Sequence, residues 1–258
     1  MRISLVQSSP RWGDPAGSRA RIDELLKDAG ETDLIVLPEM FSTGFVTHPE
    51  SLAEPSGPDG RCESLRWMQE TAAGRSCAVA GSIALRLGDS YRNRFFFVFP
   101  DGNVTHYDKH HLFTYAGEDR RFTGGTQRVV VPYGDFRILL QVCYDLRFPV
   151  FSRNRITPDG PDYDLILYVA SWPDVRVSAW DTLLKARAIE NLSFVAGINR
   201  VGEDPGNQYS GHSVLLGPDG SLLSNCKKNF EEVVTTEISK ASLNAFRKSF
   251  PALLDADL

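Results

Sequence analysis

The hydrophobic positions of this chain repeat one order of predicted elements twice. The apolar runs at 34–37 and 165–168 are each entered through an aspartate, Asp33 and Asp164, and predict buried strands. A stripe at helical spacing follows in each half, formed by Leu65, Met68 and Ala72 within 64–73 and by Trp180, Leu183, Leu184, Arg187 and Ala188 within 179–191. Strand and helix signals therefore recur in the same order.

Two short motifs extend the repeat. Val-Ala-Gly at 79–81 and again at 195–197 closes a strand-like stretch after each helical one. Pro-Asp-Gly at 100–102 and at 218–220 predicts a turn between two strands, which are 95–99 with 104–107 and 213–216 with 222–223. Each half thus reads as strand, helix, strand and hairpin.

Two such halves predict one particular α/β architecture. Each half would form a mixed sheet covered by helices on one face, and the bare apolar faces would pack together. The expectation is a four-layer α-β-β-α sandwich with internal pseudo-twofold duplication, built as a single domain over 1–258 with 54–60 and 157–162 as loops. Its core would span about 1–237, while the extension 238–258, with Leu243, Phe246 and Phe250, would pack on the same chain or on a partner subunit.

Composition excludes several classes of protein. The chain has 258 residues, 42% of them hydrophobic and 24% charged, and a net charge of −5, which is typical of a soluble globular protein. Its basic residues form only short pairs, so we expect no nucleic-acid partner. No apolar run approaches the ~20 residues of a membrane span, and the start of the chain does not resemble a secretory signal. We therefore expect a cytoplasmic protein with no membrane partner.

The four cysteines lack a C-x-x-C pair, which fits a reducing compartment and argues against a disulfide framework or a thiolate zinc site. Cys143 stands out because it follows the apolar run 136–142 and precedes Pro149, a residue that favours a helix start. A thiol at such a strand-to-helix corner is well placed for nucleophilic attack. A single cysteine is nevertheless more often an inert buried residue, so its role depends on partners.

The differences between the halves indicate where those partners lie. Glu39 follows Asp33 by six residues, whereas the matching position of the second half is Ala170. Lys109 follows the aspartate of the first Pro-Asp-Gly turn by eight residues, but Lys227 follows that of the second turn by the same number, so the lysine alone does not distinguish the halves. Alone, these residues could be a helix-start carboxylate and a surface lysine. Together with Cys143 they fall at strand exits, where α/β sheets usually carry their sites.

Histidines offer a competing interpretation. His106 and His110 lie four apart, with Asp108 between them, and could form a metalloenzyme centre if they shared a helix face. Their segment reads as a strand, however, and the chain contains no H-E-x-x-H motif. We expect no metal.

Several motifs in order resemble the carbon–nitrogen hydrolase (nitrilase) superfamily. They are Leu-Pro-Glu-Met at 37–40, Tyr-Asp-Lys-His-His-Leu-Phe at 107–113, Val-Cys-Tyr-Asp-Leu-Arg-Phe-Pro at 142–149, Ala-Ser-Trp-Pro at 170–173, Ala-Arg-Ala-Ile-Glu-Asn at 186–191 and Gly-His-Ser at 211–213. Within the superfamily the chain is most similar to the bacterial ω-amidase branch. The resemblance implies the same four-layer sandwich and a homodimer.

The resemblance also implies roles for individual residues. Cys143 would be the nucleophile, Glu39 the general base, and Lys109 the oxyanion support or proton donor. Glu118 matches the family's second glutamate, with Asp119 as a less favoured substitute. The cycle would pass through a thioester with the backbone N–H of Tyr144 supporting the oxyanion, and it would need no cofactor.

An ω-amidase would release ammonia from the amide of a short 2-oxo acid, 2-oxoglutaramate or 2-oxosuccinamate. Arg147 could bind the substrate carboxylate, or it could instead brace the loop by pairing with Asp145 or Glu190. The expected pocket walls are aromatic and comprise Phe41, Phe45, Tyr115 and Trp172. The alternatives are another hydrolase of the superfamily, acting on a nitrile, an N-carbamoyl amine or a different amide, and, more remotely, a catalytically silent binding protein.

Overall fold

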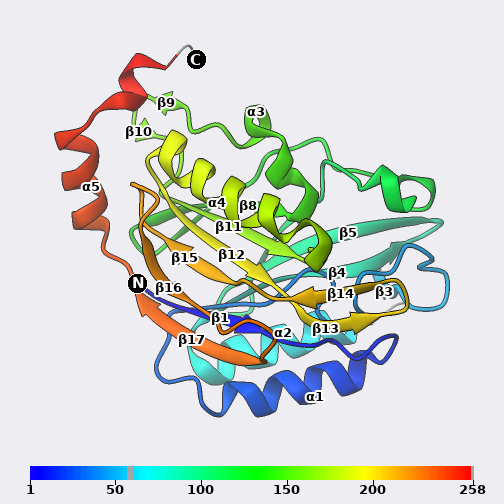
Figure 1. Cartoon of the computed structure of the whole chain (residues 1–258). Helices are drawn as coiled ribbons and strands as arrows, with labels where there is room; N and C mark the ends of the chain where they lie inside the picture. The colour runs from blue at the N-terminus through cyan, green and yellow to red at the C-terminus, as the bar shows by residue number, and fades with distance from the viewer. Residues whose placement is uncertain (57–60, 257–258) are drawn as a thin grey trace.

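Two β-sheets packed face to face form the centre of the molecule, with helices on their outer faces (Figure 1). The computed structural model describes residues 1–56 and 61–256. The first sheet has the order β17-β1-β2-β4-β5-β6, with β3 also paired to β4. Its strands are β1 (Arg2–Gln7), β2 (Leu34–Val36), β3 (Glu54–Ser56), β4 (Ala78–Leu87), β5 (Ser90–Val98), β6 (Val104–Asp108) and β17 (Glu232–Glu237).

The second sheet has the order β16-β15-β12-β11-β8-β7. Its strands are β7 (Val130–Tyr133), β8 (Phe136–Val142), β11 (Leu165–Ala170), β12 (Phe194–Asn199), β15 (Val214–Leu216) and β16 (Leu222–Asn225). Two small hairpins stand apart from both sheets, β9 (Ile156–Thr157) with β10 (Gly160–Pro161) and β13 (Val201–Asp204) with β14 (Asn207–Ser210).

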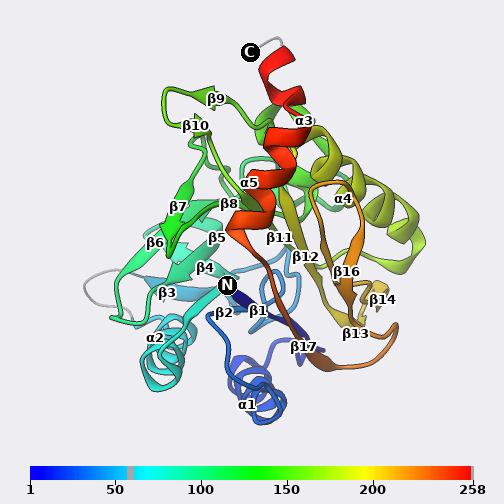
Figure 2. The ribbon, with the colours of Figure 1, turned by 90° about the vertical axis from the view of Figure 1, so that its left-hand side faces the viewer.

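The helices complete the predicted four layers. Helices α1 (Pro15–Leu26) and α2 (Glu63–Arg75) pack on the first sheet, and α4 (Val177–Asn191) packs on the second. Figure 2 shows these layers end-on, with α5 (Lys240–Ser249) at one end of the sandwich. The short helix α3 (Pro149–Ser152) follows β8. Among the described residues, no helix has the length and apolar character that crossing a membrane requires.

The apolar runs are continuous because both faces of the central strands are buried. In β2, Leu34 and Val36 face the core between the sheets, while Ile35 faces the cluster under α1 and α2. In β11, Leu167 likewise faces the core between the sheets and Ile166 faces α4. Alternate residues of each strand therefore pack into two different cores, one between the sheets and one under the helices.

The predicted duplication is present in the topology. The path β1-β2-β4-β5-β6 of one sheet corresponds to β8-β11-β12-β15-β16 of the other, with three parallel strands followed by an antiparallel hairpin. The two strand-entry aspartates act alike. The backbone N–H of Arg2 donates to Asp33 at 2.7 Å, and that of Arg137 donates to Asp164 at 2.9 Å.

The repeated Val-Ala-Gly motif has a packing reason. A Cβ at Gly81 would lie 2.8 Å from the Cβ of Leu37, and one at Gly197 would lie 2.5 Å from Leu184 Cδ1. Only glycine lets the chain approach so closely at these matching positions. The motif therefore marks equivalent contacts in the two halves.

Three expectations need correction or completion. Glu54–Ser56 forms β3 instead of a loop, while residues 57–60 of that predicted loop lie outside the described residues, and the hairpin β9–β10 occupies the second predicted loop. In the extension, Leu243 of α5 is fully buried in the core between the sheets, and Arg247 pairs with Asp164 at 2.8 Å. Helix α5 thus packs on its own chain, whereas Phe250 beyond it is 57% exposed.

Candidate active site

Cys143 lies at the predicted strand-to-helix corner. Strand β8 ends at Val142, the 3₁₀ turn Cys143–Arg147 follows, and α3 begins at Pro149. Cys143 has φ +46°, a left-handed conformation that non-glycine residues adopt rarely and that is often found at functional sites. The half-buried residue faces the same cavity as Lys109.

Asp145 holds this corner in place. Its fully buried carboxylate accepts hydrogen bonds from the backbone N–H of Val142 at 3.0 Å and from the hydroxyl of Tyr107 at 2.7 Å. It also accepts the backbone N–H of His111 at 2.9 Å and lies 2.8 Å from His111 Nδ1. The carboxylate therefore ties the Cys143 corner to the chain that leaves β6, a role that sequence reasoning missed.

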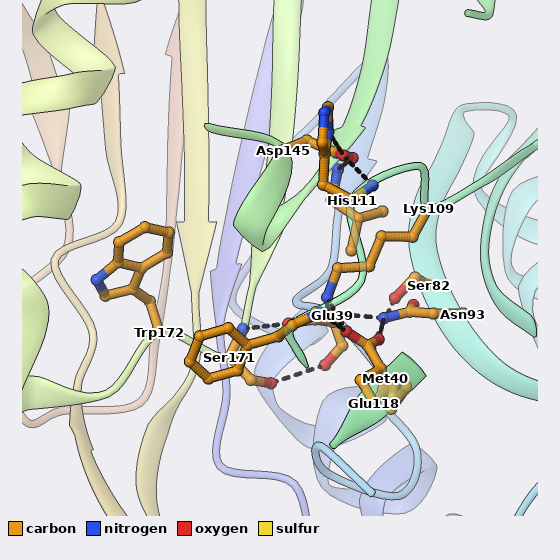
Figure 3. A network of polar contacts seen from close by, with 12 residues as sticks. Glu39, Met40, Ser82, Asn93, Lys109, His111, Glu118, Asp145, Ser171 and Trp172 are labelled. Carbon is orange, nitrogen blue, oxygen red and sulfur yellow. Dashed lines mark hydrogen bonds and ion pairs between the residues drawn. The ribbon is translucent and has the colours of Figure 1, made fainter. Parts of the chain in front are cut away.

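Glu39, Lys109 and Glu118 form one buried network (Figure 3). Lys109 Nζ lies 2.9 Å from Glu39 Oε1 and 2.8 Å from Glu118 Oε2, and all three side chains have zero exposure. Asn93 Nδ2 donates to both carboxylates, at 2.7 Å to Glu39 and 3.1 Å to Glu118. The structure thus brings together the two predicted glutamates and the lysine.

The local fold fixes each member of the network. Glu39 follows β2 and precedes Met40, whose φ of +44° turns the chain and whose backbone N–H donates to Ser82 Oγ at 2.9 Å. The other oxygen of the Glu39 carboxylate accepts the backbone N–H of Ser171 at 2.9 Å, just beyond β11. The duplicated half therefore supplies a donor where it lacks the carboxylate.

A backbone group of its own loop positions the Glu118 carboxylate. Its carboxylate accepts the backbone N–H of Phe113 at 2.7 Å, and its side chain is fully buried, whereas Asp119 beside it is exposed. The arrangement favours Glu118 over Asp119 as the second glutamate. Asn93 and Ser171 were not predicted as site residues. The one sequence signal for Asn93 is that a polar residue stands shortly before the apolar run 95–99.

The charges of the network act on the thiol. Burial raises the pKa of Cys143 well above its usual value, the nearby Glu39 carboxylate raises it further, and Lys109 opposes the rise. Burial would lower the pKa of Lys109, but Glu118 and Glu39 outweigh it and the pKa is raised, so the ammonium stays charged. Burial also raises the pKa of Glu118. Cys143 therefore rests as a thiol and needs a base at the moment of attack.

A cavity of about 500 Å³ opens beside these groups. Cys143, Tyr144 and Lys109 line it, together with four of the predicted pocket residues, Phe45, Tyr115, Arg147 and Trp172. Among the lining residues that sequence reasoning missed are Trp12, Phe113, Arg176, Asn207 and Tyr209. Most of these come from loops and a hairpin that carry no motif of their own.

Phe41 is the incorrect member of the predicted pocket. Its side chain is fully buried under α1 and α2, where its ring centroid lies 5.7 Å from that of Trp67. The left-handed turn at Met40 sends Phe41 away from the cavity, whereas Phe45, which follows the turn, contributes a ring 5.3 Å from Lys109 Nζ.

Arg147 does not brace its loop in the way that the alternative required. Asp145 is engaged as described above, and Glu190 pairs with Arg187 at 3.0 Å. The guanidinium of Arg147 lies 5.0 Å from the ring of Trp172, on the cavity wall. It is therefore available to a ligand.

The histidines of the alternative metal centre have other contacts. His110 Nδ1 lies 2.6 Å from the carbonyl oxygen of Gly125, and its ring stacks on Phe151 with centroids 4.2 Å apart. Within the part of the chain that the structure describes, no group of three or more histidine, cysteine or acidic residues could hold a metal ion.

Comparisons with known proteins agree with this geometry. The family model described as carbon-nitrogen hydrolase matches residues 2–248. An "Omega-amidase YafV" of Yersinia enterocolitica is 42% identical, covering 100% of this chain and 97% of the relative. A "2-oxoglutaramate amidase" of Bacillus subtilis is 30% identical over 98% of this chain and 96% of the relative. A crystal structure of a CN-hydrolase superfamily protein from Xanthomonas campestris, with an arsenic adduct in its active site, is 46% identical, covers 100% of this chain and 97% of that one, and has a TM-score of 0.95.

Proposed function

Because the chain belongs to the carbon–nitrogen hydrolase family and is an amide-cleaving hydrolase, we propose that it releases ammonia from 2-oxoglutaramate or 2-oxosuccinamate. The observation that carries the proposal is the buried Glu39–Lys109–Glu118 network beside Cys143 in one cavity. The relatives named for ω-amidase and 2-oxoglutaramate amidase activity support the substrate class.

In the proposed first step, the Cys143 sulfur attacks the amide carbonyl while Glu39 takes the thiol proton. Transfer to Glu39 is required because the raised pKa of Cys143 leaves little free thiolate at neutral pH. The charge that develops on the carbonyl oxygen is stabilised by the Lys109 ammonium and by the backbone N–H of Tyr144.

The tetrahedral intermediate then collapses. The carbon–nitrogen bond breaks, Glu39 returns its proton to the leaving ammonia, and a thioester remains on Cys143. Water that gives a proton to Glu39 attacks the thioester, the carbon–sulfur bond breaks, and the acid leaves as the thiol is restored. This cycle uses only side chains, a backbone amide and water.

Glu118 acts through Lys109. A lysine between two buried carboxylates stays charged. Glu118, which accepts hydrogen bonds from Lys109 and Asn93, also fixes the position of the Lys109 ammonium. Glu118 is thus proposed as a positioning residue, while Glu39 exchanges protons with the thiol, ammonia and water.

Arg147 is proposed to bind the substrate carboxylate. Its guanidinium lines the cavity, lies 5.0 Å from the centre of the Trp172 ring and can form two parallel hydrogen bonds to a carboxylate. Trp172 would then contact the carbon chain between the acid and the amide, with Phe45 and Tyr115 as further walls.

A coupled ammonia assay tests the substrate class. We expect kcat/KM for 2-oxoglutaramate and 2-oxosuccinamate to exceed that for simple nitriles and for N-carbamoyl amino acids by at least about 100-fold, because only the former present both an amide and a correctly spaced carboxylate. Faster turnover of a nitrile or an N-carbamoyl amine would favour another reaction of the superfamily. A complete lack of turnover, with no labelling of Cys143 by a thiol-reactive amide analogue, would support a silent binding protein.

A homodimer is proposed from an exposed apolar patch. Val150 is 74% exposed and Ile189 49%, and both line a groove between α3, α4 and the last 3₁₀ turn, Ala252–Asp255, on which Leu254 is 71% exposed. A patch of this kind indicates a protein contact. The free state of all four cysteines supports our further proposal of a cytoplasmic location.

Light scattering after size exclusion tests the dimer. We expect the wild type to be a dimer and the double variant Val150→Asp with Leu254→Asp to be a monomer, because two carboxylates per subunit would be buried unpaired. The control is Leu222→Asp, at a residue that is 59% exposed on β16 and should leave the dimer intact. A monomeric wild type would refute the proposal.

A further inference from the structure

Two arginines of the cavity lack acidic partners. Arg147 and Arg176 both line the cavity that holds Cys143, and across residues 1–56 and 61–256 neither guanidinium forms an ion pair. Arginines elsewhere in the described chain have partners of other kinds: Arg94 pairs with Asp108 at 2.7 Å, and Arg153 donates to the carbonyl oxygen of Glu190 at 3.2 Å. An unpaired guanidinium on a concave wall is a binding group for an anion.

Both arginines are half-buried, but they lie over aromatic rings of very different exposure. Arg147 covers Trp172, which is only 3% exposed, so this guanidinium belongs to the inner wall. The Arg176 guanidinium lies 5.4 Å from the ring of Phe113 and 5.8 Å from that of Tyr115, which is 83% exposed. Arg176 therefore lies at the mouth of the cavity.

A hydrogen bond to the backbone of Arg176 helps to fix its position. The indole N–H of Trp172 donates to the carbonyl oxygen of Arg176 at 2.8 Å, which links the outer arginine to the ring beneath the inner one. The guanidinium then rests on two rings that come from another loop. Such stacking keeps the guanidinium edges free for hydrogen bonds.

Asp174 and Asp204 accept hydrogen bonds from other groups, and in the described residues neither forms an ion pair with Arg176. Asp174 accepts the hydroxyl of Ser210 at 2.5 Å, and Asp204 accepts the backbone N–H groups of Gly206 and Asn207 within its own turn, at 2.9 and 2.8 Å. The cavity, at about 500 Å³, is also in the range that holds drug-sized ligands, and so exceeds the needs of a five-carbon acid.

We propose that Arg176 forms an outer anion-binding position, so that the enzyme also hydrolyses ω-amides whose carboxylate lies further from the amide than in 2-oxoglutaramate. Arg147 would serve the five-carbon substrate, and Arg176 would serve acids longer by one or two methylene groups. The inference rests on the proposed function and extends its substrate class. The reaction is the same: amide and water give acid and ammonia.

Arg176→Met tests the proposal, because methionine keeps a long apolar side chain over the two rings and removes the charge. We expect kcat/KM for the six- and seven-carbon 2-oxo acid ω-amides to fall about 10- to 100-fold, the effect of one charged hydrogen-bonded pair. The value for 2-oxoglutaramate should change by less than about threefold. The matched control is Arg86→Met, at an exposed arginine on β4 outside the cavity, which should change neither.

Three results would overturn the outer position. They are equal losses of kcat/KM on the five-carbon and the longer substrates, no loss on either, and a wild type that is inactive on the longer amides.

Alkylation of Cys143 tests the role of Arg176 even if no 2-oxo acid amide is a substrate. The probes are 6-maleimidohexanoate and its uncharged methyl ester, with the modified Cys143 peptide quantified by mass spectrometry. The wild type should favour the anion, and Arg176→Met should lose this preference about tenfold or more; an unchanged preference would contradict the inference.

Discussion

Cys143→Ala is expected to lower ammonia release from 2-oxoglutaramate by at least about 10⁴-fold, because the chain then has no nucleophile to form a thioester. The remaining Glu39–Lys109–Glu118 network does not need the sulfur, since its hydrogen bonds join the three side chains to one another and to Asn93. The fold should therefore persist. Cys143→Ser should be similarly inactive, because a hydroxyl is a far weaker nucleophile at the same place.

The measurement is the coupled ammonia assay together with thermal unfolding. Cys77→Ala is the matched control, because Cys77 is a fully buried thiol in the cluster under α1 and α2 and does not line the cavity. It should retain turnover at a modest cost in stability. Amidase activity within about tenfold of wild type in Cys143→Ala would refute the assignment.

Glu39→Gln is expected to lower turnover by about 10³-fold or more while making the thiol more reactive. The amide cannot accept the thiol proton or pass it to ammonia, so catalysis fails. The Glu39 carboxylate also raises the pKa of Cys143, whereas Lys109 lowers it. Removing the Glu39 charge leaves the lysine, so the pKa of Cys143 falls and the thiolate fraction at neutral pH rises.

The loss of turnover and the higher reactivity of the thiol are separated by measuring the rate of ammonia release and the rate of Cys143 alkylation as functions of pH. The rate of Cys143 alkylation by iodoacetamide should reach its plateau at lower pH in Glu39→Gln than in the wild type. Glu118→Gln is the control, because its carboxylate positions Lys109 without receiving the proton, and we expect a smaller loss of turnover. A variant Glu39→Gln that keeps near-normal turnover, or whose alkylation profile moves to higher pH, would contradict the proposed base.

Some of this structure could be predicted because it follows from local pattern. The entry aspartates Asp33 and Asp164 precede matching apolar runs, and both faces of those strands are buried, so pattern and topology agree. The same logic predicted that residues at strand exits would meet. Glu39, Lys109 and Cys143 indeed lie around one end of the two sheets.

Other features depended on contacts that sequence spacing does not show. The left-handed turn at Met40 decides that Phe45 enters the cavity and Phe41 does not, and no local pattern announces that turn. Asn93 reaches Glu39 across 54 residues. Arg176 receives its aromatic platform from a loop about sixty residues earlier in the chain, so its role was not visible before the fold was known.

During turnover, Cys143 is expected to carry the acyl group of the substrate as a thioester. The most direct test mixes enzyme with 2-oxoglutaramate, quenches the reaction in acid during turnover, and measures the mass of the peptide that contains Cys143. We expect a fraction of this peptide to be heavier by the mass of the acyl group. Hydroxylamine should remove the added mass, and Cys143→Ala should not show it. An acyl group on another residue, or steady ammonia release in Cys143→Ala without any acylated peptide, would contradict this expectation.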